Sequence, residues 1–188
     1  MYTKKIYFSG GSFYELQEVF AHVRGVQDTC VGYINGSGQV SHEMVQNGSQ
    51  KAIMGVEICY DPKKTDISTL MDILFAVINP YSRDKQGECA GSMYSSGVYY
   101  AAAEDAPLVD LHMNFIANRG RPPAAAEASL TLNDPNHDRR LLRRCYARAM
   151  PLQCFQPAGE EHQHYLRKHP GGHTFIDFFR LRELRIIS

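Results

Sequence analysis

The sequence predicts an α+β fold, a two-layer sandwich in which helices cover one face of a sheet. Two observations support this prediction. Between residues 4 and 101, segments with strand or helix periodicity follow in the order strand, helix, strand, strand, helix, strand. The chain of 188 residues is also 44% hydrophobic and 11% aromatic, which excludes a disordered protein and allows one sizeable core.

The first half of this pattern is a strand, a helix and a second strand. Residues 4–9 alternate and are rich in aromatic and β-branched types, which predicts a strand that stops at a Ser-Gly-Gly turn. From Phe13 onward, apolar residues recur at i, i+3, i+4 and i+7, which predicts a helix that ends before Gly25. Residues 27–34 predict a strand, and a loop rich in Gly and Ser follows it.

The second half repeats the strand and helix periodicities. Residues 52–60 predict a strand that an Asp-Pro pair stops, and apolar positions between residues 67 and 78 predict a helix. Residues 81–96 predict a loop long enough to be functional, and residues 97–101 a fourth strand. This order is the split βαβ, or ferredoxin-like, βαββαβ arrangement.

The remainder of the chain predicts an extension of this core. We expect a single domain over residues 1–188, with a core at about 3–101 and a C-terminal wrap at about 102–188. Expected elements within the wrap are a weak helix at 104–118, a basic helix at 138–143, a strand at 148–155, a short helix at 160–168 and an apolar tail, from residue 174, that packs on the body.

Charge and composition exclude several classes of partner. Twenty Lys and Arg balance twenty Asp and Glu, so we expect no nucleic-acid partner and no anionic membrane surface. No segment approaches the ~18 apolar residues of a membrane span, and the N-terminus predicts a strand rather than a signal peptide. A cytoplasmic protein is therefore expected. Five cysteines is an odd number, so complete disulfide pairing would leave a free thiol.

Several short segments resemble one known family in their order and spacing. Residues 8–14 (FSGGSFY) are similar to the F-A-G-G-C-F-W active-site turn of methionine sulfoxide reductase A. Further similar segments are GV at 25–26, VGYING at 31–36, YDPK at 60–63, NP at 79–80, QG at 86–87, FQPA at 155–158, HQHYL at 162–166 and PGG at 170–172. Because the matches keep their order from residue 8 to residue 172, the chain is identified as a member of this family.

The resemblance implies reduction of the S epimer of methionine sulfoxide, free or in a peptide. In that family a Cys thiolate at a helix N-terminus attacks the sulfoxide sulfur, and a Glu protonates the oxygen with help from two Tyr and an Asp. A Phe-Trp pair seats the methyl group, and thioredoxin regenerates the thiol. The implied partners are a small molecule or a Met-containing peptide, with thioredoxin if the site is redox-active, and no cofactor is implied.

Three of the family's catalytic positions carry other residues here. The nucleophile position is Ser12, the proton-donating Glu falls on Met54, and the Asp falls on Cys89. A serine hydroxyl does not ionise at neutral pH even at a helix terminus, and a thioether cannot titrate. The sequence therefore predicts a divergent member of the family that lacks the catalytic Cys.

The aromatic residues of the family's pocket are largely retained. The two Tyr are identified with Tyr33 and Tyr94, the Phe-Trp pair with Phe13 and Tyr14, and the His-Gln segment contains His162. These residues predict an aromatic pocket for a small ligand, made more apolar by the methionine that replaces the acid. The expected catalytic residues are Ser12, Cys89, Tyr33 and Tyr94, and the expected substrate-binding residues are Phe13, Tyr14, Met54 and His162.

Two of these residues allow alternative roles. Ser12 and Glu15 have the spacing of a capping box, in which the hydroxyl accepts from a first-turn N–H and the carboxylate reaches back. As a nucleophile, Ser12 would need a base and an oxyanion site. Cys89 is either an exposed thiol of low pKa that acts as nucleophile or redox sensor, or a passive, partly buried residue.

The expected function is that of a divergent methionine sulfoxide reductase A-like protein, repurposed for another small-molecule or sulfur substrate or for binding. Two alternatives stay open: a peptide-methionine (S)-S-oxide reductase inactivated by a Cys-to-Ser change at Ser12, and a non-catalytic binding or regulatory module. The sequence leaves open whether the protein is an enzyme. The histidines between residues 162 and 173 lack metal-ligand spacing, so no metal is expected.

Overall fold

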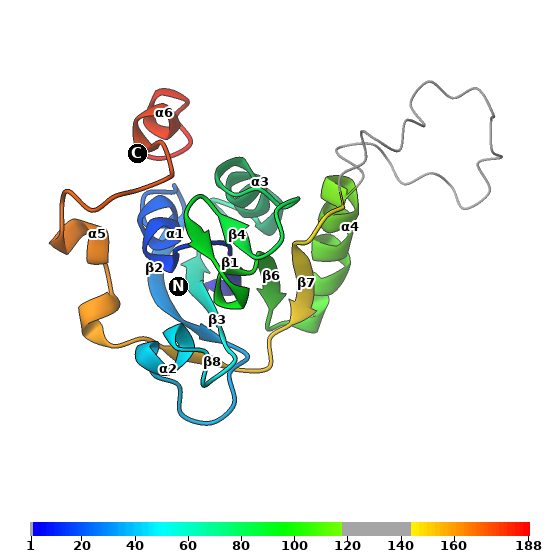
Figure 1. The fold of residues 1–188 in the computed structure, drawn as a ribbon. Coiled ribbons are helices and arrows are strands. Elements are labelled where there is room, and N and C mark those ends of the chain that lie inside the picture. Colours follow the sequence, from blue (N-terminus) through cyan, green and yellow to red (C-terminus); the bar gives the residue numbers. More distant parts are fainter. Residues whose placement is uncertain (1, 118–143) are drawn as a thin grey trace, which may run out of the picture.

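The structure, a computed structural model, describes residues 2–117 and 144–188, so the predicted basic helix at 138–143 lies outside the described residues. The predicted βαββαβ arrangement is confirmed. Two helices pack on one face of an antiparallel arrangement of strands in the order β6-β1-β3-β2 (Figure 1). In chain order its elements are β1 (Lys4–Ser9), α1 (Phe13–Phe20), β2 (Val26–Ile34), β3 (Ile53–Tyr60), α3 (Ile67–Val77) and β6 (Gly97–Tyr100).

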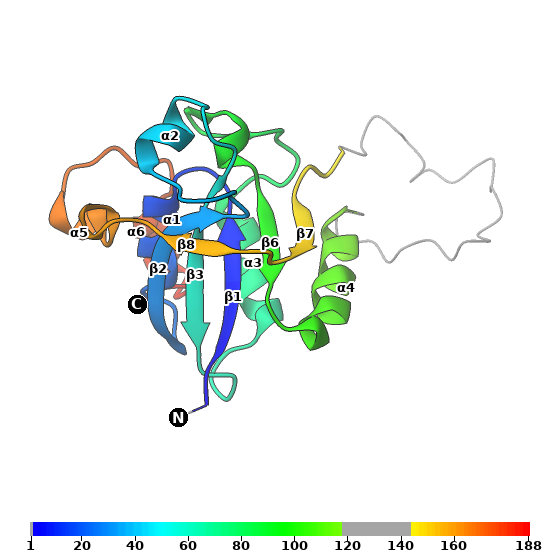
Figure 2. The ribbon, with the colours of Figure 1, turned by 90° about the horizontal axis from the view of Figure 1, so that it is seen from below.

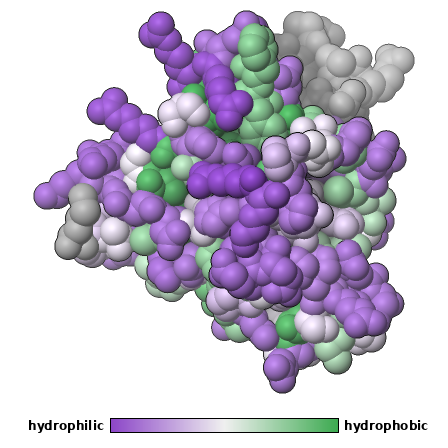
Figure 3. Space-filling view, turned by 90° about the vertical axis from the view of Figure 1, so that its left-hand side faces the viewer, coloured by the Kyte–Doolittle hydropathy of each residue, from purple (hydrophilic) through white to green (hydrophobic). Residues whose placement is uncertain are grey.

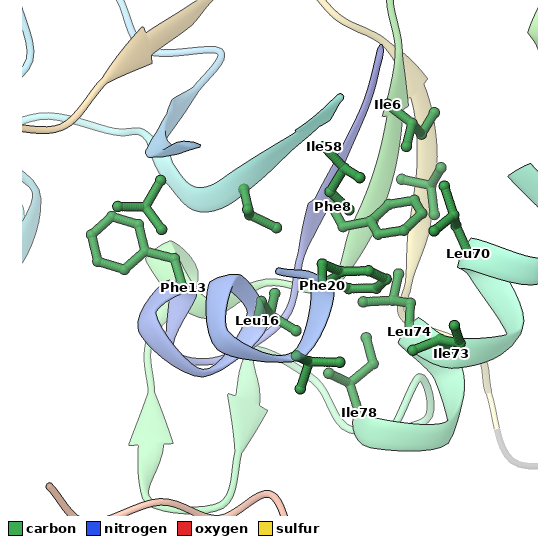
Figure 4. Close-up of a cluster of buried hydrophobic side chains, with 14 of the residues drawn as sticks. Ile6, Phe8, Phe13, Leu16, Phe20, Ile58, Leu70, Ile73, Leu74 and Ile78 are labelled. Carbon is green, nitrogen blue, oxygen red and sulfur yellow. The ribbon is translucent and has the colours of Figure 1, made fainter. Parts of the chain in front are cut away.

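The hydrophobic core lies between the two helices and the face of the sheet that they cover, here called the inner face. Side chains alternate across a strand, so every second residue of β1 and β3 reaches this face. Figure 4 shows these side chains meeting those of α1 and α3. The fully buried members include Ile6, Phe8, Leu16, Phe20, Ile58, Leu70 and Leu74.

Two connections carry short elements that the sequence does not predict. Helix α2 (His42–Gln46) lies between β2 and β3, and the side chain of its N-cap residue Ser41 accepts a hydrogen bond from the N–H of Met44. The predicted loop at 81–96 contains a small hairpin and a 3₁₀ turn. These are β4 (Lys85–Gln86), β5 (Cys89–Ala90) and η1 (Ser92–Tyr94).

The predicted strand at 148–155 is instead two strands on opposite edges of the sheet. After η2 (Ala103–Asp105) and α4 (Ala106–Ala117), strand β7 (Arg148–Pro151) pairs parallel with β6, and β8 (Phe155–Pro157) pairs antiparallel with β2. Figure 2 shows the chain crossing the outer face of the sheet between them. There, Leu152 and Phe155 pack against Tyr7, Ile34 and Tyr99. This second, smaller apolar cluster gives the reason for the crossing.

The predicted helix at 160–168 is also divided, into η3 (Glu160–His162) and α5 (Tyr165–Lys168). His164 has a positive φ of 51°, which interrupts a helix. The side chain of Gln163 also accepts from the N–H and donates to the carbonyl oxygen of Val31, each at 2.9 Å. The Gln163 amide thus pairs with backbone groups at the edge of β2 that β8 does not reach, and it fixes η3 beside α1.

The apolar tail packs on the body only in part. Ile176 and Leu181 of the tail and of α6 (Phe178–Glu183) contact the core, whereas the side chain of Phe179 is 73% exposed. The side of the molecule shown in Figure 3 is mainly hydrophilic, with hydrophobic groups in small areas. Among the described residues, no helix is both long and apolar enough to cross a membrane.

Candidate functional site

The turn between β1 and α1 places Ser12 against the β4–β5 hairpin. Gly10 and Gly11 have positive φ angles of 153° and 73°, which glycine adopts without strain. A Cβ atom on Gly11 would lie 2.7 Å from the Cβ of Gln86, and the Gly11 N–H donates to the carbonyl oxygen of Tyr94 at 3.1 Å. The Gly-Gly turn therefore brings the start of α1 next to the hairpin and η1.

Ser12 is the N-cap residue of α1, but the predicted capping box is wrong. The hydroxyl makes no capping hydrogen bond within the described part of the chain. Glu15 is buried, and its carboxylate accepts from the backbone N–H of Phe175 instead of reaching back. Burial raises the pKa of Glu15, while the backbone N–H groups of Phe175 and Ile176 lower it. The half-buried hydroxyl of Ser12 therefore has no structural partner at the helix terminus.

Cys89 lies on β5 and is half-buried beside Ser12. Burial raises the pKa of the Cys89 thiol, the Glu15 carboxylate also raises it, and the backbone N–H of Ser12 lowers it. The net direction is upward, so the thiol is protonated at neutral pH. The interpretation of Cys89 as an exposed thiol of low pKa is therefore wrong, and the passive, partly buried cysteine fits the structure.

Three predicted residues, Phe13, Tyr33 and Met54, form the buried base of the site, which we call the floor. Tyr33 of β2 and Met54 of β3 are paired in register, and the rings of Phe13 and Tyr33 lie 6.0 Å apart. Each of the three side chains is at most 2% exposed. Burial raises the pKa of Tyr33, so its phenol stays protonated. The floor is aromatic and apolar, as predicted.

Three polar rings, Tyr14, His42 and His162, stand over the floor, and we call them the rim. The hydroxyl of Tyr14 lies 2.7 Å from Nδ1 of His162, and the hydroxyl of Tyr33 lies 3.0 Å from Nδ1 of His42. The two imidazoles stack with centroids 4.2 Å apart, and His42 also stacks on Phe13. Burial lowers the pKa of His42, and the neighbouring His162 lowers it further. His42 is therefore neutral at pH 7.

His42 is the site residue that sequence reasoning missed. It lies in the connection between β2 and β3, where no strand or helix periodicity is present, so nothing in the pattern places it near Tyr33. The available signal was Ser41, a good N-cap residue, followed by Glu43 in a first turn. Recognition of that short helix would have marked the connection as a structured part of the site.

Tyr94 lies on the hairpin side of the site, apart from Tyr33. Its pKa is raised by burial and then by Cys89, and no ring contact joins it to Tyr33 among the described residues. Tyr14 lies between the two: burial and the phenols of Tyr165 and Tyr94 raise its pKa to about 12. The two predicted catalytic tyrosines therefore do not act on one another directly.

The carboxylate nearest in sequence to Met54 lies on the other face of the sheet, because residues three apart along a strand point to opposite faces. Glu57 accepts hydrogen bonds from the hydroxyl of Tyr7 at 2.7 Å and from Nζ of Lys5 at 3.0 Å. It therefore cannot supply a proton to the floor. Within residues 2–117 and 144–188, no group of three or more His, Cys, Asp or Glu side chains is placed to hold a metal ion.

Comparison with known proteins gives one consistent family. The family model of peptide methionine sulfoxide reductase matches residues 4–185. A peptide methionine sulfoxide reductase MsrA of Mycoplasma genitalium is 30% identical over 177 residues, which cover 93% of this chain and 99% of that protein. Mxr1 from Saccharomyces cerevisiae in reduced form aligns with a TM-score of 0.75 at 22% identity, over 92% of this chain and 88% of that one.

The same yeast protein has also been solved in complex with Trx2. That structure aligns with a TM-score of 0.53 at 16% identity, over 87% of this chain and 84% of the other. At these identities the two yeast structures are evidence for the fold alone.

Proposed function

Since this chain belongs to the peptide methionine sulfoxide reductase family, we propose that it binds a methionine-type sulfur side chain at the N-terminus of α1 without the family's usual chemistry there. The observation that carries this proposal is the half-buried hydroxyl of Ser12 beside the floor. A serine hydroxyl supplies no thiolate at neutral pH, and Met54 supplies no proton. Binding can persist where this chemistry cannot.

The floor supports binding of a methyl-sulfur group. Phe13 and Tyr33 present aromatic surface next to the thioether of Met54, and sulfur makes favourable contacts with aromatic rings. The rim covers the floor but is itself half-buried, so a ligand side chain reaches the floor from solvent when the rim rings move apart. The ligand is then methionine or its sulfoxide, free or within a peptide.

Calorimetry tests the binding step. N-acetylmethionine amide and its sulfoxide should both give saturable heats with the unmodified protein. Tyr14→Ala, which removes a ring of the rim, should weaken both by roughly tenfold, or about 1.4 kcal/mol. Tyr2→Ala is the matched control, because Tyr2 is 69% exposed and lies outside the site. Flat titrations for both ligands would overturn the proposal.

A second experiment tests whether the chemistry has been lost at Ser12 alone. We expect no sulfoxide reduction with dithiothreitol by the unmodified protein, a trace by Ser12→Cys, and a clear rate only when Met54→Glu is combined with it, since attack and protonation are both needed. Full activity of Ser12→Cys alone would favour a reductase inactivated only at its nucleophile. Reduction by the unmodified protein would contradict the proposal.

A further inference from the structure

The two imidazoles of the rim differ in the hydrogen bonds that remain open to a ligand. His42 comes from α2 and His162 from η3, and each uses Nδ1 for a tyrosine hydroxyl. The Nε2 atom of His162 faces the Glu161 carboxylate at 3.6 Å. The Nε2 atom of His42 has no partner among the described residues. Of these two rings, His42 alone therefore has a ring nitrogen without a hydrogen-bond or ion-pair partner among the described residues.

The protonation state of His42 follows from its tyrosine partner. Tyr33 is buried, and His42 is the single described partner of its hydroxyl. A buried O–H without an acceptor is costly, so the phenol donates to Nδ1 rather than accepting from it. A neutral imidazole that accepts at Nδ1 carries its proton on Nε2. His42 therefore offers an N–H donor.

This donor is accessible. The Nε2 atom lacks a protein partner among the described residues, but it is not buried, so water or a ligand reaches it. The ring stacks on Phe13 and on His162, and the rings of Phe13 and His162 themselves lie 6.4 Å apart. These two stacks and the hydrogen bond to Tyr33 hold the ring in place before any ligand arrives, which reduces the entropic cost of using its donor.

We propose that the Nε2–H of His42 is the specificity-determining donor of this site, which binds the oxygen of a sulfoxide in the absence of an acid at Met54. The inference rests on the proposed function. A sulfoxide oxygen is a strong acceptor and a thioether sulfur a weak one. The donor therefore favours the oxidised side chain over the reduced one, whereas the floor binds the methyl-sulfur part of both.

The test compares N-acetylmethionine amide with its sulfoxide by calorimetry at pH 7.5. We expect the unmodified protein to bind the sulfoxide roughly tenfold more tightly. His42→Phe keeps an aromatic ring on Phe13 but loses the donor, so the ratio should fall to about 1 through weaker sulfoxide binding alone. His42→Gln keeps an N–H donor and should recover part of the ratio. His22→Phe, at the other end of α1, should leave it unchanged.

Each result separates the inference from the function on which it rests. If neither ligand binds the unmodified protein, the proposed function fails. If both bind equally well, or if the preference survives His42→Phe, the function stands and the role of His42 is overturned. If the melting temperature shows that His42→Phe does not fold, His42→Leu, which also lacks the donor, replaces it, because loss of the preference there without loss of thioether binding still assigns the donor to this ring.

Discussion

The floor and the rim of the site are held by different forces. Phe13, Tyr33 and Met54 of the floor are buried by regular elements, and their positions follow from strand and helix periodicity. His42 and His162 of the rim come from irregular connections and are half-buried, held by hydrogen bonds to tyrosines and by stacking. Changes in the floor should therefore cost stability, whereas changes in the rim should mainly alter ligand preference and pH dependence.

The largest expected effect is the loss of the floor's central ring. Phe13→Ala removes a side chain that is 1% exposed and contacts Tyr14, Tyr33 and His42, so we expect a loss of about 4 kcal/mol in the free energy of unfolding. Urea denaturation followed by circular dichroism measures it. The control is Phe179→Ala, at a 73% exposed position, which should change stability by less than about 0.5 kcal/mol. Equal losses in the two variants would contradict the division.

A charge placed in the floor should have the next largest effect. Met54→Glu buries a carboxyl without a partner, which should cost about 3 kcal/mol at pH 7. Burial raises the pKa of such a carboxyl, so the cost appears as pH rises through the raised value and diminishes when the group binds a proton near pH 5. Met44→Glu, on the exposed face of α2, is the control. A loss that is the same at both pH values would show that the carboxyl reaches solvent.

Changes in the rim should alter the pH dependence of the free energy of unfolding rather than its value at neutral pH. The pKa of His42 is lowered by burial and by His162, against a smaller opposing effect of Glu161. The stability that neutral His42 contributes is present above about pH 6.5 and is lost as pH falls toward the lowered pKa. Denaturation between pH 5 and 7.5 should show a shallower decline in the free energy of unfolding for His42→Phe than for the unmodified protein. An unchanged pH slope would contradict this.

The smallest effect is expected for Glu15→Gln, at a residue that is buried like the floor but held by hydrogen bonds like the rim. Its pKa is raised by burial, so the cost of its charge appears as pH rises and disappears on acidification. Glu15→Gln keeps an acceptor for the N–H of Phe175 and should change stability at pH 7 by no more than about 0.5 kcal/mol. Glu15→Ala leaves that N–H unpaired and should cost about 1–2 kcal/mol. Thermal denaturation distinguishes the two, and equal losses would show that the hydrogen bond is not used.

The fold was predictable from the sequence because it depends on local periodicity, whereas the floor residues were identified through the family resemblance. The geometry of strands and helices dictates the alternation along β1 and β3 and the i, i+3, i+4 spacing of α1. The elements and their order could therefore be predicted correctly. The opposite orientations of Met54 and Glu57 are the same rule applied at an offset of three residues. Such inferences need no knowledge of distant contacts.

The predictions that were wrong concern segments whose structure depends on contacts with residues distant in the sequence. The strand predicted at 148–155 is divided because Leu152 and Phe155 find an apolar cluster on the outer face of the sheet. The capping box failed because the Phe175 N–H competes for the Glu15 carboxylate. In both cases the partner lies far away in the sequence, so a local pattern cannot contain it.

The sequence by itself determined the family and the order of strands and helices. Residue types and spacing suffice for these. Only the tertiary structure decided that burial raises the pKa of Cys89, and that His42 stands over the floor with a free donor. Burial and the pairing of hydrogen bonds are set by contacts between segments, and those contacts exist only in the folded chain.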